Sequence, residues 1–106
     1  MMNEEGAQVA MKIIYYAGNA KSSALQAIDA AFSGDQDKAT AKLAEAKKQL
    51  NSAHNIQTSL MTDEMNGKMI EKSIILIHAQ DQFMAANTEI ELGERLIKFS
   101  AKALNS

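Results

Sequence analysis

A histidine and an aspartate lie three residues apart in residues 74–84, a segment rich in apolar side chains. In a helix, residues i and i+3 share one face, so we expect His78 and Asp81 to lie on the same surface. The apolar pattern predicts that this surface is dry, and burying such polar groups costs free energy unless they are paired. A neutral imidazole is a nucleophile near neutral pH, whereas a carboxylate binds hard cations. The segment is therefore the first place to look for function.

Both residues also have ordinary structural explanations. His78 could be a core histidine satisfied by one hydrogen bond, and Asp81 could be a surface residue at the edge of the apolar stripe. If copies of Asp81 met at a symmetry axis instead, their charges would repel unless they took up protons or bound a shared cation. Oxygen ligands alone favour a hard cation such as Mg²⁺.

Two other residues are weaker candidates for a site. His54 is open to three interpretations: a second site, a hydrogen-bond donor to His78, or a partly exposed residue. Gly18 belongs to a small-residue notch with Ala17 and Ala20, which permits the close approach of another backbone or a phosphate, or serves packing alone. The sequence has no cysteine, no glycine-rich phosphate loop and no His-Glu-x-x-His or Glu-x-x-His metal motif.

The composition predicts one all-α domain that spans residues 1–106. Helix-forming residues are abundant and proline is absent. The net charge is −2 without a basic block, which argues against nucleic acid as a partner. No segment is apolar enough for a transmembrane helix, and the N-terminus does not resemble a signal peptide. We therefore expect a cytoplasmic protein.

Three helices are expected, over about residues 4–32, 36–61 and 70–103. The first has two neighbouring apolar stripes: one is formed by Val9, Ile13, Tyr16 and Ala20, and the other by Ile14, Leu25, Ile28 and Phe32. Gly34 and Asp35 suit the end of this helix and the N-cap of the next one. A turn at Asn66-Gly67 lies within the least regular segment, residues 62–72.

The third predicted helix has two apolar faces. One contains Leu76, Phe83, Ile90 and Ile97, which recur at intervals of seven. The other follows a 4-3 alternation through Ile74, His78, Asp81, Ala85, Thr88, Leu92, Arg95 and Phe99. An antiparallel three-helix bundle buries only one such face, so the second predicts self-association through this helix. The alternative is a monomer with a wide core stripe.

Three separated segments resemble one known family. They are residues 77–84 (Ile-His-Ala-Gln-Asp-Gln-Phe-Met), 17–22 (Ala-Gly-Asn-Ala-Lys-Ser) and 53–60 (Ala-His-Asn-Ile-Gln-Thr-Ser-Leu). In order and spacing they are similar to the lactose/cellobiose-type enzyme IIA components of the bacterial phosphoenolpyruvate-dependent sugar phosphotransferase system. The resemblance covers nearly the whole chain.

This resemblance implies a trimer of three-helix protomers that carries phosphate on His78, with Nε2 expected as the phosphorylated atom. It implies phosphorylation by the histidine-containing phosphocarrier protein and transfer to a cysteine of the cognate IIB component. It also implies that Asp81 of the three subunits binds one divalent cation, expected to be Mg²⁺. Gln80 is expected to have a supporting role at most. The membrane is involved only through the IIC transporter, and lactose, cellobiose and chitobiose systems all remain open.

Two other functions compete with this expectation. In the first, the chain is a non-catalytic trimeric helical adaptor, in which His78 and Asp81 only specify assembly. In the second, it is a metal-storage or metal-dependent bundle, for which one carboxylate per chain is too few ligands unless a trimer supplies the others. Phosphorylation of His78 separates the phosphocarrier from both.

Overall fold

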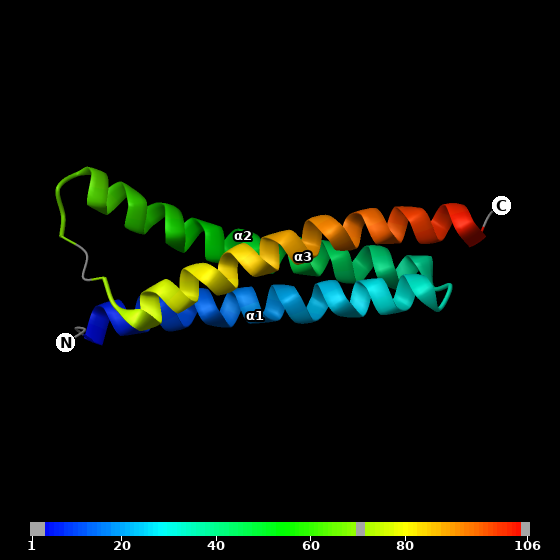
Figure 1. Cartoon of the computed structure of the whole chain (residues 1–106), viewed down its shortest axis with the longest axis horizontal. Coiled ribbons are helices and arrows are strands. Elements are labelled where there is room, and N and C mark those ends of the chain that lie inside the picture. Colours follow the sequence, from blue (N-terminus) through cyan, green and yellow to red (C-terminus); the bar gives the residue numbers. More distant parts are fainter. Residues whose placement is uncertain (1–3, 70–71, 105–106) are drawn as a thin grey trace.

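The computed structural model describes residues 4–69 and 72–104, which form three long helices (Figure 1). They are α1 (Glu4–Phe32), α2 (Gln36–Met65) and α3 (Ile74–Leu104). α1 and α3 run in the same direction and α2 runs against both, in a rod of 55 × 21 × 17 Å. This arrangement confirms the predicted all-α, three-helix architecture. None of the three helices, as far as they are described, has an apolar stretch long enough to cross a bilayer.

The turn between α1 and α2 forms as its residues predict. Gly34 has φ +86°, a conformation that costs glycine little and other residues more. The side chain of Asp35 caps α2 by accepting a hydrogen bond from the Lys38 amide at 3.1 Å. The two helices are therefore joined by a short connection whose backbone groups are satisfied.

The connection between α2 and α3 is displaced by four residues: it spans residues 66–73, where residues 62–69 were predicted. α2 continues one turn beyond the predicted end at residue 61, because no helix breaker precedes Asn66-Gly67. Gly67 has φ +83°, as a turn at this dipeptide requires. α3 begins at Ile74, later than the predicted residue 70, where the Ser73 hydroxyl accepts a hydrogen bond from the Leu76 amide at 3.2 Å. Residues 70–71, on which the predicted start fell, lie outside the described residues.

Small side chains make up much of the core. Ala20, Ala24, Ala46 and Ala86 are almost completely buried together, with Leu43 and Leu50 packed against them. Gly93 extends this pattern on α3: a Cβ at this position would lie 3.3 Å from the Ile28 side chain. Because these residues have little volume, the three backbones can approach closely without cavities.

α1 is the central helix of the bundle. α2 and α3 both pack mainly on α1 and contact each other less, and Figure 1 shows the C-terminal end of α2 turning away from α3. Of the two stripes predicted on α1, the first includes Ile13 and Ala20, which are completely buried. The second was wrong in part, because Leu25 and Phe32 are 45% and 61% exposed. The buried face of α1 is formed largely by alanines instead. The first predicted stripe therefore lies on the face that packs against α2 and α3, whereas the second extends beyond that face.

Candidate functional site

The second predicted face of α3 is exposed along its whole length. It consists of Ile74, His78, Asp81, Ala85, Thr88, Leu92, Arg95 and Phe99, and we call it the α3 stripe. Ile74, Leu92 and Phe99 are 87%, 56% and 69% exposed, although they are large and apolar. A protomer thus buries one apolar face of α3 and leaves the other in water, as the sequence predicted. An uncovered apolar face of this length marks an interaction surface.

His78 lies at the end of the α3 stripe near the start of the helix. Its ring is exposed and makes no hydrogen bond or ion pair with any other described residue. Helical side chains tilt toward the N-terminus of their helix, where the helix dipole favours negative charge. Ile74 and Ile77 flank it and are also exposed. The arrangement is an accessible nucleophile within an apolar surface, not a group inside a deep pocket.

Asp81 lies one turn after His78 on the same stripe. It is exposed and, like His78, has no hydrogen bond or ion pair within the described part of the chain. No group of three or more histidine, cysteine, aspartate or glutamate side chains that could hold a metal ion occurs among the described residues. One protomer therefore offers a divalent cation a single carboxylate at this position.

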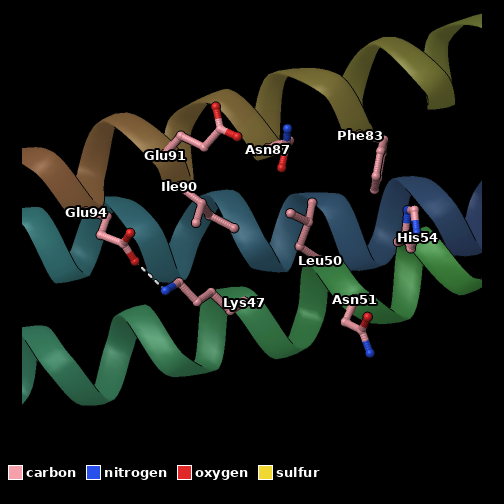
Figure 2. Close-up of a pocket in the computed structure, with 9 residues that line it drawn as sticks. All are labelled: Lys47, Leu50, Asn51, His54, Phe83, Asn87, Ile90, Glu91 and Glu94. Carbon is pink, nitrogen blue, oxygen red and sulfur yellow. Dashed lines mark hydrogen bonds and ion pairs between the residues drawn. The ribbon is translucent and has the colours of Figure 1, made fainter.

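His54 lies in a groove between α2 and α3, away from the α3 stripe. The groove has a volume of about 340 Å³ and is lined by Lys47, Leu50, Asn51, His54, Phe83, Asn87, Ile90, Glu91 and Glu94 (Figure 2). At one end the His54 ring stacks on Phe83, with ring centroids 6.0 Å apart. Its Nε2 lies 3.5 Å from the Thr58 hydroxyl, and no hydrogen bond joins it to His78 within the described chain.

An ion pair between Lys47 and Glu94 closes the other end of this groove. The hydrogen bond and the positive charge of the Lys47 ammonium lower the pKa of the Glu94 carboxyl below its ordinary value. Both side chains remain partly exposed to solvent, which screens their attraction. The pair therefore joins α2 to α3 at a distance from His78 and has no evident role in its chemistry.

Gln80 points to the α2 side of α3 and not toward His78. Its Oε1 accepts a hydrogen bond of 2.6 Å from Nε2 of Gln57 on α2. Gln57 was not among the predicted site residues. It is the polar member of an otherwise apolar 4-3 alternation on α2, which consists of Ala39, Leu43, Ala46, Leu50, Ala53, Gln57 and Leu60. Gly18 is exposed on α1, and a Cβ added there would meet no atom within 4 Å.

Comparison with known proteins gives one consistent result. Residues 8–101 match the model of the family described as "PTS system, Lactose/Cellobiose specific IIA subunit". A lichenan-specific phosphotransferase enzyme IIA component of Bacillus subtilis is 41% identical over 101 residues, which cover 95% of this chain and 92% of that protein. A lactose-specific EIIA component of Lacticaseibacillus casei is 36% identical, over 90% of this chain and 85% of that protein.

Solved structures of two IIA components also superpose on this chain. The cellobiose-specific enzyme IIA of Bacillus anthracis superposes with a TM-score of 0.95 and 36% identity, over 100% of this chain and 96% of that one. The IIA(chitobiose) structure of Escherichia coli, solved as a complex with HPr, gives a TM-score of 0.82 at 33% identity. It covers 98% of this chain and 100% of that one.

Proposed function

Because the chain belongs to the lactose/cellobiose-specific IIA subunits of the sugar phosphotransferase system, we propose that it is a phosphocarrier that acts through His78. The observation that carries this proposal is the exposure of His78, which has no hydrogen-bond partner among the described residues. A carrier must present its nucleophile to two different proteins in turn. An accessible imidazole within an apolar surface meets that requirement, whereas a buried histidine would not.

In the proposed reaction, Nε2 of His78 attacks the phosphorus of the phosphohistidine of HPr, the histidine-containing phosphocarrier protein. The new N–P bond forms as the donor's N–P bond breaks, and the electron pair of that bond returns to the donor imidazole. The HPr complex of the Escherichia coli relative supports HPr as the donor. Catalysis then consists mainly of aligning the two imidazoles in line and stabilising the charge of the transferring group. The nearby positive end of α3 favours that charge.

The second proposed step passes the phosphoryl group to the thiolate of a cysteine in the cognate IIB component. An S–P bond forms as the N–P bond at His78 breaks. We propose that this relay operates in the cytoplasm and supports uptake of a β-linked disaccharide through a membrane-embedded IIC transporter. The relatives named for lactose and cellobiose support this substrate class. The carrier itself need not touch the sugar.

We also propose that the chain forms a homotrimer through the α3 stripe. The exposed 4-3 pattern of this stripe supports packing against other helices. In a symmetric trimer, three copies of Asp81 near the axis would supply three carboxylates to one divalent cation, with water completing the six oxygen ligands that Mg²⁺ prefers. The cation would offset the repulsion between these carboxylates and so favour assembly.

The experiment that tests this function is incubation with phosphoenolpyruvate, enzyme I and HPr. We expect acid-labile phosphate on His78 of the wild type. A His78→Ala variant should fold normally, because this side chain is exposed, and accept no phosphate. His54→Ala is the matched control for the final extent of labelling, since the chain has two histidines and His54 is not the proposed acceptor. Absence of label from the wild type would favour the non-catalytic adaptor instead.

A further inference from the structure

Two side-chain pairs join α2 to α3 at the end of the bundle that carries His78. Gln57 donates to Gln80 at 2.6 Å, and His54 stacks on Phe83 with an interplanar angle of 21°. Within each helix the two residues are three positions apart, so the pairs occupy consecutive turns. We call these four residues the α2–α3 clasp.

The clasp precedes the C-terminal end of α2, which turns away from α3 (Figure 1). Met61 and Met65 in this end are 57% and 83% exposed. Toward this end of the described chain, the bond from Gln57 to Gln80 is the last hydrogen bond between α2 and α3. Among the described residues, this is therefore the position at which a hydrogen bond joins the first turns of α3 to α2.

The position of this bond bears on the direction in which His78 points. At 100° per residue, Gln80 lies about 200° around the helix from His78, on the opposite side. Ala79, between them, packs against Ala10 and Ile13 of α1. Ile75, Leu76 and Phe83 of α3 pack against the same cluster. Apolar contacts have no preferred direction, so they restrict rotation of the helix less sharply than a hydrogen bond, whose geometry is directional. The Gln57–Gln80 hydrogen bond therefore adds a directional contact to the apolar packing that sets the rotation of this part of α3.

We propose that Gln57 is a positioning residue for the phosphorylation of His78, an inference that rests on the proposed phosphocarrier function. By holding Gln80, it holds the start of α3 in the rotation that presents the imidazole to the phosphoryl donor. Transfer between two histidines is sensitive to this rotation, because the reacting nitrogens and the phosphorus must lie in line. Gln57 touches none of the reacting atoms and acts only through α3.

The test compares Gln57→Leu with Gln49→Leu. Gln49 is a matched control, because it lies on the same helix, is also partly buried and accepts a cross-helix hydrogen bond, but from Asn19 of α1 at 3.5 Å. Single-turnover transfer from phosphorylated HPr is measured at saturating donor over a range of pH. We expect Gln57→Leu to slow transfer about tenfold, with little change in donor affinity or pH profile, and Gln49→Leu to retain the wild-type rate.

A paired substitution tests whether the cross-helix bond itself is responsible. Gln80→Leu alone should slow transfer as much as Gln57→Leu, and the double Leu variant should be no slower than either single variant, because each substitution removes the same bond. Equal rate losses in Gln57→Leu and Gln49→Leu would overturn the proposal, because they would reflect general destabilisation.

Amide hydrogen exchange gives a readout that does not depend on phosphotransfer. We expect Gln57→Leu, but not Gln49→Leu, to accelerate exchange at residues 78–82, whose amides bond within the first turns of α3. Unchanged exchange at these residues would overturn the role of Gln57. Failure of the wild type to accept phosphate would overturn the proposed function itself, and these two failures are distinguishable.

Discussion

The hydroxyl of Ser100 donates a 2.8 Å hydrogen bond to the carbonyl oxygen of Ala31, which joins the C-terminal parts of α3 and α1. Ser100 is only 6% exposed, so this bond is made in the core. The same carbonyl also accepts from the Gly34 amide at the end of α1. The Ser100 bond therefore fixes the register of two parallel helices at the point where α1 ends.

Replacing Ser100 by alanine should destabilise the protein by about 1 kcal/mol, because a buried hydrogen bond is lost while the carbonyl keeps another donor. The measurement is urea unfolding at one fixed protein concentration. Ser59→Ala is the control, since that exposed hydroxyl bonds only to the Asn55 carbonyl of its own helix. Equal effects of the two substitutions would contradict a role in helix register.

Two glycines should respond oppositely to alanine. Gly18→Ala should raise the free energy of unfolding by about 0.5–1 kcal/mol, because glycine weakens a helix interior and the added methyl group meets open space. Gly34→Ala should lower it by about 1 kcal/mol, because φ is +86° there. Thermal or urea unfolding measures both. A destabilising Gly18→Ala would instead indicate that another backbone packs against this position in the assembled protein.

The proposed trimer gives a prediction for Asp81→Leu. The variant should remain trimeric when divalent cations are chelated, because leucine removes the axial charges and adds apolar contact. Chelation should weaken the wild-type assembly by about tenfold, which corresponds to about 1.4 kcal/mol. Sedimentation equilibrium with and without chelator measures this difference. A monomeric or unfolded Asp81→Leu variant would show that the carboxylate does not face other copies across an axis.

The ion pair between Lys47 and Glu94 predicts a dependence on pH. The folded-state pKa of Glu94 is lowered, so the stability that it contributes is present above the ordinary carboxyl pKa and is lost as the pH falls through the lowered value. The wild type should be slightly more stable than Glu94→Gln at neutral pH, and this difference should shrink in acid, below the ordinary carboxyl pKa. Urea unfolding at neutral and at acidic pH measures it. A stability difference between the two proteins that grew in acid would contradict a lowered pKa of Glu94.

Several features of this protein follow from local sequence alone. The absence of proline and the abundance of helix formers predict three helices, and Gly34 with Asp35 predicts the first turn, because caps and turns depend on neighbouring residues. The same reasoning placed the end of α2 at residue 61, one turn before its observed end at Met65. The helix continues because no residue in 62–65 breaks it. The 4-3 pattern on α3 correctly predicted a second face that one protomer does not bury.

Other features were decided only by the way the helices pack. The pattern could not show that alanines bring α1 close to its neighbours while Leu25 and Phe32 remain in water. Nor could it show that His54 meets Phe83, or that Gln80 meets Gln57. Periodicity specifies which residues share a face of one helix, whereas a cross-helix pair also depends on the rotation, register and separation of two helices. Those quantities are set by packing over the whole length of the bundle, and so they exist only in the tertiary structure.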